Sequence, residues 1–283
     1  MRTIFVEANG LRFEVLEAGS GDRLALCLHG FPEHAISWRH QMPVLAAMGY
    51  HVWAVNQRGY GRTTRPPRVS DYALPHLVDD VAALIDASGA REVVLVGHDW
   101  GAMVAWCFAA VQRRPLAHLV IMNVPHPLCF RAALKYWRQL RKSWYIAFFQ
   151  IPWLPERLLA TGGERMVRRM FAGVALPPDV LAIYRDQIAE PGAATAMLNW
   201  YRATRSLTSP PLDLARVIEV PTLVIWGEAD VALDTLCLDG TERYVRDLTL
   251  RRLPGVSHWV QQDAPEAVNR LLQDFLQQSN PTA

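Results

Sequence analysis

Cysteine is scarce in this 283-residue chain, and its thiols do not stand at spacings typical of metal sites or redox motifs. No Cys-x-x-Cys pair occurs, and no histidine lies at zinc-finger distance from a cysteine. Three of the four thiols lie in or beside apolar runs, which predicts small buried hydrophobic side chains in a reducing compartment. The four residues are Cys27, Cys107, Cys129 and Cys237.

Long hydrophobic runs and an excess of one charge are also absent. The chain has no stretch of about 18 apolar residues, so no transmembrane helix is expected. Residues 1–10 have no apolar stretch long enough for a signal peptide, which makes the cytoplasm the expected compartment. Lysine and arginine number 29 against 27 acidic residues, and this balance does not favour a nucleic-acid partner.

The composition that remains, 51% hydrophobic and 20% charged residues, is that of a soluble globular protein with room for a core and a pocket. In its first part, short apolar runs alternate with helical patterns, which predicts an α/β fold whose mostly parallel sheet is covered by helices on both faces. Strands are expected at residues 11–17, 24–28, 51–55, 93–96 and 119–122, and helices at about 74–87 and 102–110.

The pattern changes after residue 125. Up to about residue 214 the chain looks helical, with proline-rich breaks at 151–155 and 176–178 and no strand-like run. Strand patterns return at 220–226 and about 248–253, before a last helix at about 265–276. We therefore predict a core of residues 1–125 and 215–283 and a helical cap of residues 126–214 over the carboxyl edge of the sheet, where open α/β sheets bind ligands.

Residues 97–101 read Gly-His-Asp-Trp-Gly, with a strand pattern before them and a helix pattern after them. This is the layout of a nucleophile elbow, with Asp99 where many such turns have serine. Gly97 and Gly101 suit a sharp, strained turn, because a side chain there would clash with the neighbouring strand or helix. The alternative is that Asp99 only caps the following helix.

An aspartate in this position implies a particular chemistry. A carboxylate that attacks an sp³ carbon displaces a leaving group and leaves an alkyl ester. Water then hydrolyses this ester by attack on the aspartate carbonyl. Such a route suits epoxides and alkyl halides better than esters, so Asp99 is predicted to be the nucleophile of a hydrolase that needs no metal or cofactor.

Residues 29–33, His-Gly-Phe-Pro-Glu, follow an early predicted strand and are expected to lie beside the elbow. The backbone N–H groups of Phe31 and Trp100 are predicted to form an oxyanion hole, and such tight turns favour a cis bond before Pro32. The alternative is an ordinary loop between a strand and a helix. His29 is expected to be structural, and no spacing supports metal binding by the other nearby histidines, His34, His40 and His98.

Ester hydrolysis requires a general base and a group that orients it. His258 follows the last predicted strand, and Asp230 follows the strand before it. The chain order Asp99, Asp230, His258 is the nucleophile–acid–histidine order of this topology. The alternatives are a surface aspartate and a histidine packed in a loop. Other polar groups stand nearby, namely the competing acids Glu228 and Asp234 and the neutral Asn123.

With these motifs, the sequence resembles the epoxide hydrolases of the α/β-hydrolase superfamily, close to the soluble and related membrane-associated types. The resemblance covers nearly the whole chain and implies an α/β-hydrolase core with a cap. It is most specific in His-Gly-Phe-Pro-Glu together with Gly-His-Asp-Trp-Gly. The matching segments are residues 29–33, 58–61 (Arg-Gly-Tyr-Gly), 97–101, 199–202 (Asn-Trp-Tyr-Arg), 226–230 (Trp-Gly-Glu-Ala-Asp) and 255–259 (Gly-Val-Ser-His-Trp).

In that family two cap tyrosines hold the epoxide oxygen and donate a proton as the ring opens. Tyr201 matches the second tyrosine, and Tyr145 resembles the first. The chemistry agrees, because ring opening generates an alkoxide and a phenol is a neutral donor that keeps its proton at pH 7. The alternative is that both tyrosines only pack in an aromatic-rich cap.

The sequence departs from the family pattern at Asn56, where the family usually has aspartate. We interpret the change as structural, although it could loosen that loop.

Two other functions, a haloalkane dehalogenase and a non-catalytic binding protein, are compatible with parts of the sequence. A haloalkane dehalogenase shares Gly-His-Asp-Trp-Gly but resembles His-Gly-Asn-Pro in the first loop and does not require two cap tyrosines, so Phe31, Tyr145 and Tyr201 favour the epoxide hydrolase. A catalytically silent binding protein with a hydrolase fold would not need an intact nucleophile, acid and base. The expected partner is therefore a small lipophilic epoxide.

The predicted cap is rich in basic and aromatic residues. Two interpretations are open: a membrane-facing surface that receives apolar epoxides, or a solvated cap face, which the sequence favours. Between residues 130 and 169 the only acids are Glu156 and Glu164. The basic residues there are Arg131, Lys135, Arg138, Arg141, Lys142, Arg157, Arg165, Arg168 and Arg169.

Overall fold

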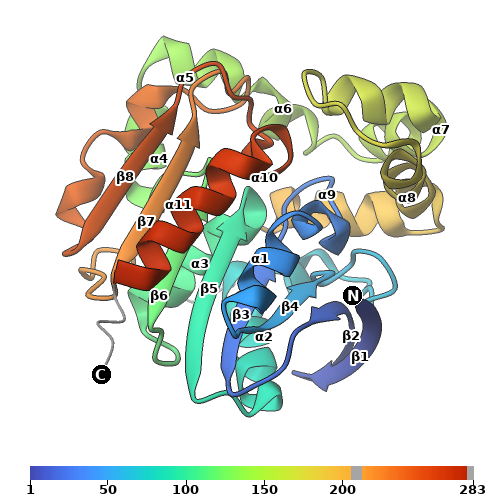
Figure 1. Cartoon of the computed structure of the whole chain (residues 1–283). Coiled ribbons are helices and arrows are strands. Elements are labelled where there is room, and N and C mark those ends of the chain that lie inside the picture. Colours follow the sequence, from blue (N-terminus) through green and yellow to red (C-terminus); the bar gives the residue numbers. More distant parts are fainter. Residues whose placement is uncertain (205–211, 279–283) are drawn as a thin grey trace.

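The structure, a computed structural model, describes residues 1–204 and 212–278. Its strands form one sheet in the order β1-β2-β4-β3-β5-β6-β7-β8 (Figure 1). β2 pairs antiparallel with β1 and with β4, and the other pairings are parallel, which confirms the predicted mostly parallel α/β sheet. The strands are β1 (Arg2–Ala8), β2 (Leu11–Ala18), β3 (Arg23–Leu28), β4 (His51–Val55), β5 (Glu92–His98), β6 (His118–Met122), β7 (Thr222–Gly227) and β8 (Leu248–Leu253).

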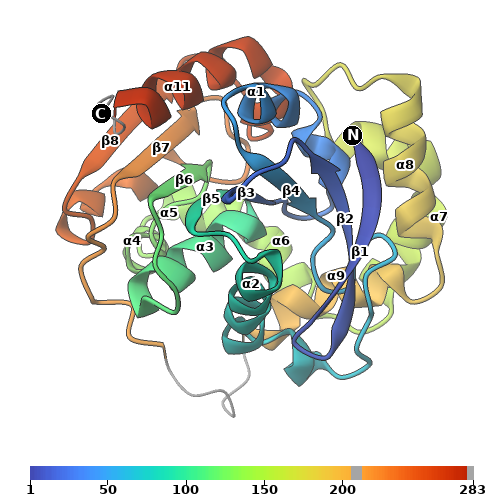
Figure 2. The ribbon, with the colours of Figure 1, turned by 60° about the horizontal axis from the view of Figure 1, so that its bottom comes forward.

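Helices cover both faces of the sheet because successive strand side chains point to opposite faces. In β3, Ala25 and Cys27 join the apolar core under α1 (Gln41–Ala47) and α11 (Pro265–Gln278). Leu24, Leu26 and Leu28 join the core on the other face, under α2 (Leu74–Ser88) and α3 (Trp100–Val111). Figure 2 shows α1 and α11 together on one side of the sheet and α2 and α3 on the other. Burial on both faces explains why these strands are nearly continuous apolar runs.

The chain between β6 and β7 is helical, as predicted. No strand occurs in its described parts, residues 123–204 and 212–221. In Figure 1, α5, α6 and α7 lie at the end of the sheet towards which β5 and β7 point. That residues 126–214 make up a separate cap domain stays a prediction. The helices are α4 (Pro127–Ala133), α5 (Trp137–Lys142), α6 (Trp144–Phe148), α7 (Leu154–Met170), α8 (Pro178–Ala189) and α9 (Ala193–Ala203).

Several smaller expectations can be checked directly. The four cysteines are buried and free, as predicted. The Phe31–Pro32 peptide bond is cis, which confirms the expectation for that turn. Within the described ranges, no helix combines the length and apolar composition that a membrane span requires.

Among the elements that were not predicted from the sequence are β1 and α1. β1 pairs with β2 along its whole length through a turn at Asn9 and Gly10, both with positive φ. Asn-Gly between two strand patterns is a strong hairpin signal, which the sequence interpretation overlooked. α1 is only seven residues long and contains Pro43, so its helical pattern is weak.

The turn that carries Asp99 is strained, as predicted. β5 ends directly before Asp99, whose φ of 49° and ψ of −125° are unusual for a residue with a side chain, and α3 begins at Trp100. A Cβ on Gly97 would lie 2.6 Å from the carbonyl oxygen of Gly101, and one on Gly101 would lie 2.1 Å from that of Leu28. The Asp99 side chain makes no capping hydrogen bond to α3, so the helix-cap alternative is wrong.

Gly101→Ala is therefore expected to destabilise the protein by about 3 kcal/mol or more, because the new methyl group meets backbone atoms that have no free space to move into. Gly89→Ala is the control, since Gly89 has a positive φ but open space around a Cβ; it should cost about 1 kcal/mol. Urea unfolding followed by circular dichroism measures both. Equal losses in the two variants would contradict the close approach of the turn to β3.

Candidate active site

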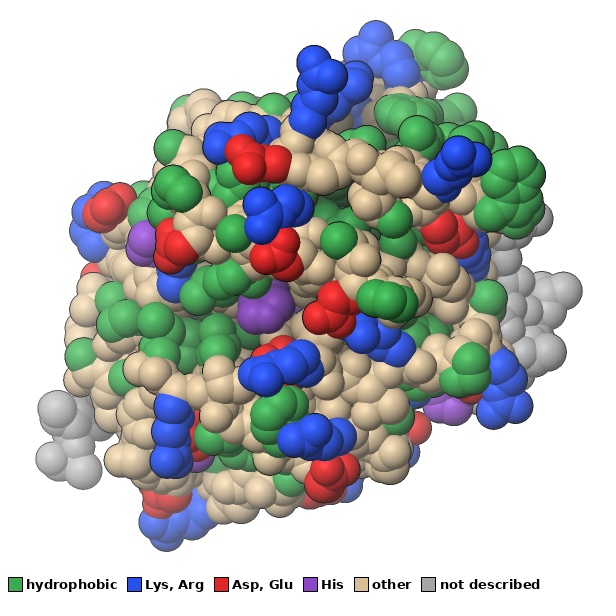
Figure 3. Space-filling view, turned by 90° about the vertical axis from the view of Figure 1, so that its right-hand side faces the viewer, with side chains coloured by type: hydrophobic (Ala, Val, Ile, Leu, Met, Phe, Trp, Pro, Cys, Tyr) green, Lys and Arg blue, Asp and Glu red, His purple; other side chains and the backbone are tan. Residues whose placement is uncertain are grey.

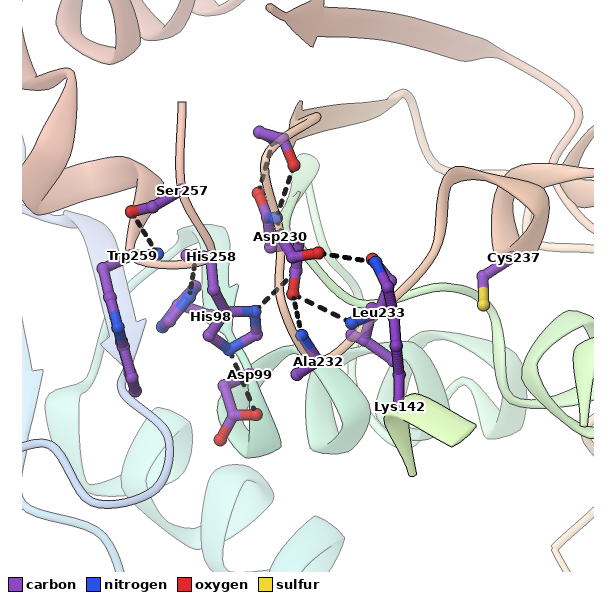
Figure 4. Close-up of polar contacts among 12 residues, drawn as sticks. His98, Asp99, Lys142, Asp230, Ala232, Leu233, Cys237, Ser257, His258 and Trp259 are labelled. Carbon is purple, nitrogen blue, oxygen red and sulfur yellow. Dashed lines mark hydrogen bonds and ion pairs between the residues drawn. The ribbon is translucent and has the colours of Figure 1, made fainter. Parts of the chain in front are cut away.

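The structure brings together three side chains that the sequence singled out. Asp230 Oδ2 lies 2.6 Å from His258 Nδ1, and His258 Nε2 lies 3.5 Å from Asp99 Oδ2 (Figure 4). The three residues come from loops after β7, β8 and β5. The side chain of Asp230 is fully buried, that of His258 is 6% exposed, and that of Asp99 is 16% exposed. The imidazole thus links a buried carboxylate to one that a small molecule can approach.

Asp230 is held as a carboxylate by its neighbours. Its Oδ1 accepts hydrogen bonds from the backbone N–H groups of Ala232 and Leu233, and its Oδ2 accepts one from Asn123 Nδ2 at 2.8 Å. Burial raises the pKa of Asp230, but the charge of His258 and these hydrogen bonds outweigh it, and the pKa is lowered. Asp230 therefore stays ionised next to the imidazole of His258, which it orients.

The two competing acids bind other partners. Glu228 forms an ion pair with Arg252, and Asp234 forms ion pairs with Arg138 and Lys142. Among the described residues, His258 pairs only with Asp230 and Asp99. The geometry therefore favours Asp230 as the orienting acid.

The pKa of His258 is raised well above its ordinary value. Burial by itself lowers the pKa of the imidazole, but the carboxylates of Asp230 and Asp99 outweigh it and raise the pKa to about 10. The resting site thus holds an imidazolium between two carboxylates. Part of this shift depends on the negative charge of Asp99, so any reaction that removes that charge lowers the pKa of His258.

One predicted oxyanion donor already binds Asp99. The backbone N–H of Phe31 donates to Asp99 Oδ1 at 2.6 Å. Burial raises the pKa of Asp99, but hydrogen bonding and the charge of His258 outweigh it, so the pKa is lowered and the group stays ionised. Trp100 is the first residue of α3, directly after Asp99. The role of its N–H as a second donor stays a prediction.

The two predicted tyrosines lie together beside these loops. The Tyr201 ring packs edge-on against Phe31 and Trp100, with centroids 5.3 and 5.1 Å away, and its centroid is 6.1 Å from that of Tyr145. Burial, with a further contribution from the negative charge of Asp99, raises the pKa of both phenols. Both hydroxyls therefore keep their protons over the whole physiological pH range.

Tyr60, in the Arg-Gly-Tyr-Gly segment, is a further buried phenol near Asp99, and the sequence predicted no role for it. Its ring packs on His29 and Trp200, and burial and the charge of Asp99 raise its pKa. Its hydroxyl has no hydrogen-bond partner within the described part of the chain.

His29 has the structural role that the sequence predicted. It is fully buried, its Nδ1 lies 2.9 Å from the carbonyl oxygen of Gly30, and its Nε2 accepts a hydrogen bond from the backbone N–H of Gln57. Burial lowers the pKa of His29 to about 4. One nitrogen donates and the other accepts, so the ring is a neutral brace for the loop of residues 29–33.

A buried pair that the sequence did not predict connects three loops of the site. His98 Nδ1 lies 2.7 Å from Glu33 Oε2, and His98 Nε2 lies 2.9 Å from the backbone oxygen of His258. Both ring nitrogens face acceptors, so the hydrogen-bond pattern is satisfied by an imidazolium next to a carboxylate. The His98 side chain and the Glu33 side chain are both fully buried. This pair fixes the turn of Asp99 to the loop of His258.

Glu33 has further donors around it. Its Oε1 accepts from Gln261 Nε2 and Gln262 Nε2, and its Oε2 accepts from the backbone N–H of Gly30. Burial raises the pKa of Glu33, but His98 and these hydrogen bonds outweigh it, and the pKa is lowered. The signal in the sequence was a lone carboxylate in an otherwise apolar loop, which needs buried partners.

Asn56, the departure from the family pattern, is firmly bound. Its Oδ1 accepts from the backbone N–H of Ala35 at 2.7 Å, and its Nδ2 donates to Glu14 Oε2 at 2.8 Å. An aspartate here would place a second carboxylate beside Glu14, which the amide avoids. The structure therefore supports the structural interpretation of this change, and the loop is not loosened at this point.

The fold and the site can now be compared with known proteins. Residues 26–265 match the family model of the α/β hydrolase fold. Human epoxide hydrolase 4 is 36% identical over 96% of this chain and 78% of its own length. Epoxide hydrolase A of Mycobacterium tuberculosis is 34% identical over 96% of each chain. The chain therefore belongs to the epoxide hydrolases of the α/β-hydrolase superfamily, as its motifs predicted.

Solved structures agree with this assignment. The crystal structure of epoxide hydrolase A from Mycobacterium thermoresistibile superimposes with a TM-score of 0.83, at 32% identity over 98% of both chains. A variant of an epoxide hydrolase from Bacillus megaterium, in complex with a naphthyloxy-propane-diol product, superimposes with a TM-score of 0.87. It is 29% identical, over 97% of this chain and 100% of that one.

Asp230→Asn is expected to lower the pKa of His258 well below about 10, because it removes the charge that opposes burial most strongly. Asp234→Asn is the matched control, since Asp234 lies on the same loop but does not contact His258. The pKa is measured by NMR titration of the His258 ring in each variant. A His258 that titrates as in the wild type after Asp230→Asn would contradict the proposed source of the shift.

Proposed function

We propose that this protein hydrolyses a lipophilic epoxide to a vicinal diol through an alkyl ester on Asp99. The observation that carries the proposal is the arrangement of Asp99, His258 and Asp230, with Tyr145 and Tyr201 packed beside it. An ionised carboxylate that a small molecule can approach suits attack on an sp³ carbon, and two protonated phenols suit the alkoxide that ring opening produces.

In the first step, Tyr145 and Tyr201 donate hydrogen bonds to the epoxide oxygen. Asp99 Oδ1 is bound by the N–H of Phe31, so Oδ2 is the oxygen that attacks a ring carbon. The bond between that carbon and the epoxide oxygen breaks, and the oxygen takes a proton from a tyrosine. The product of this step is an ester whose carbonyl oxygen, Oδ1, stays at the Phe31 N–H.

In the second step, water hydrolyses the ester. The ester no longer carries the negative charge of Asp99, so the pKa of His258 falls. The imidazolium proton passes to the tyrosine phenolate left by the first step, and the neutral imidazole becomes available as general base. His258 takes a proton from water, and the hydroxide attacks the Asp99 carbonyl carbon. The N–H groups of Phe31 and Trp100 bind the tetrahedral oxyanion. Collapse expels the diol oxygen, which takes the proton from His258, while Asp230 stabilises the imidazolium until that transfer. The Asp99 carboxyl group then gives its remaining water-derived proton to His258, which restores the resting site.

The aromatic surroundings of Asp99 favour a substrate with an apolar, ring-bearing substituent. Phe31 packs on Phe149 and on Tyr201, with centroids 5.2 and 5.3 Å away. The Bacillus megaterium relative binds a naphthyloxy diol as its product. We therefore expect aryl glycidyl ethers or styrene oxide to be better substrates than short polar epoxides.

Asp99→Ala is expected to lower epoxide turnover by about 10⁴-fold or more, while His258→Gln should accumulate the ester. Intact-protein mass spectrometry after mixing with styrene oxide would show the mass of one substrate added to His258→Gln, on Asp99. A binding protein without catalysis would show no added mass. Near-wild-type turnover by Asp99→Ala would contradict the mechanism.

Tyr145→Phe and Tyr201→Phe should each lower kcat for epoxides by about 10²-fold or more, because the alkoxide loses a proton donor. Tyr136→Phe is the control, since Tyr136 lies nearby in sequence and is exposed. The same variants are assayed for halide release from haloalkanes. Halide release without diol formation in the wild type would instead favour the dehalogenase alternative.

A further inference from the structure

Exposed large hydrophobic side chains gather in one segment of the chain, which runs from just before α5 through α6 to the start of α7. Eleven large hydrophobic side chains are exposed among the described residues, and eight of them fall between residues 136 and 158. Three are tryptophans, exposed by 72%, 66% and 70% at Trp137, Trp144 and Trp153. We call the cluster the aromatic surface; it consists of Tyr136, Trp137, Leu140, Trp144, Ile151, Trp153, Leu154 and Leu158.

We propose that the aromatic surface docks this protein onto an anionic lipid bilayer. Apolar patches of this kind are rare on monomeric soluble proteins and mark interaction sites. The sequence alone favoured a solvated face for this segment. We depart from that interpretation because the large apolar side chains of the segment are exposed on the protein surface.

Hydrogen bonds on the inner side of α5 fix the part of the aromatic surface that this helix carries. α5 turns two of its polar side chains, Gln139 and Lys142, inward. Gln139 Nε2 donates to the carbonyl oxygen of Ala232 at 3.0 Å, and Gln139 Oε1 accepts from the backbone N–H of Asp234 at 2.7 Å. Lys142 Nζ donates to the carbonyl oxygen of Asp230 at 2.7 Å, and Figure 4 shows this side chain reaching Asp230. The outer side of α5 therefore carries Trp137 and Leu140 together with arginine, while Gln139 is buried and Lys142 half-buried. A solvated surface helix would have its large apolar side chains on the inner side.

The second part is anchored in the same way. Arg202 donates to the carbonyl oxygens of Phe149 and Ile151, at 3.0 and 2.8 Å, and forms an ion pair with Glu156. These bonds fix the segment that presents Ile151 and Trp153 outward. The apolar side chains of the surface are therefore displayed by a rigid support on both parts.

The charges around the aromatic surface point to an anionic partner. The only acids between residues 130 and 169, Glu156 and Glu164, are already paired with Arg202 and Arg168. Figure 3 looks at the side of the molecule that carries α7 and α8, and it shows hydrophobic and basic side chains next to one another along its upper and right-hand edges. Among the described residues no ion pair involves six exposed cations there, Arg131, Lys135, Arg141, Arg157, Arg165 and Arg169.

Exposed tryptophan and tyrosine surrounded by lysine and arginine is the composition of a surface that lies at the headgroup level of a membrane. The rings enter the interface, and the cations bind anionic headgroups. The surface also borders the candidate site, because α6 carries exposed Trp144 next to Tyr145, whose ring packs inward on Phe149. Docking would bring the site next to apolar molecules dissolved in lipid.

The test is flotation of the full-length protein with vesicles of phosphatidylcholine and phosphatidylglycerol, or of phosphatidylcholine alone. At low salt we expect binding to the anionic vesicles to exceed binding to the neutral ones by about tenfold, and to fall as salt is raised. The double variant Trp137→Ser/Trp153→Asn should lower binding by about tenfold. Both side chains are exposed, and circular dichroism checks that the fold is retained. The readout does not depend on the chemistry at Asp99.

A matched pair of charge variants tests the electrostatic part. Lys135→Gln/Arg141→Gln should lower binding to anionic vesicles by about tenfold at low salt. Arg216→Gln/Arg270→Gln removes the same charge from exposed positions outside the surface and should leave binding unchanged. Failure of the wild type to float with anionic vesicles would overturn the proposal. So would unchanged flotation of the tryptophan variant, or a dimer that depends on Trp137 and forms without any lipid binding.

Discussion

The strained turn at Asp99 is the feature on which the rest of the site depends. Its φ of 49° directs a carboxylate out of the end of a buried strand, and the missing side chains of Gly97 and Gly101 let β5, α3 and the end of β3 approach closely. Such a conformation persists only where the surroundings over-determine it. Here the Phe31 N–H and the His258 imidazole bind the two oxygens of the carboxylate, so the strain is matched by contacts that a nucleophile needs.

Two buried charge systems hold these contacts in place. Asp230 orients His258 from one side, and the Glu33–His98 pair fixes the loops of Asp99 and His258 to each other from the other side. The first system shifts the pKa of His258 and links it to the charge of Asp99. In the proposed mechanism, that linkage is what lets one imidazole be charged in the resting site and serve as base once Asp99 is esterified.

Much of the fold and the candidate site could be predicted because their signals are local. The glycines around Asp99, the apolar runs of the sheet and the order of Asp99, Asp230 and His258 are all read along the chain. The Glu33–His98 pair was missed because no sequence pattern links the two residues, which meet only in the folded protein. The orientation of α5 could not be predicted for a similar reason: composition does not say which side of this helix is buried, and only the bonds of Gln139 and Lys142 decide it.

The central claim is that Asp99, and not water, attacks the substrate. A single turnover with enzyme in excess over styrene oxide, in water labelled with ¹⁸O, tests it most directly. Attack by Asp99 predicts a diol without ¹⁸O and one ¹⁸O atom in the Asp99 carboxylate, because water enters at the ester carbonyl. A diol that carries ¹⁸O, with Asp99 unlabelled, would show direct attack by water and contradict the account.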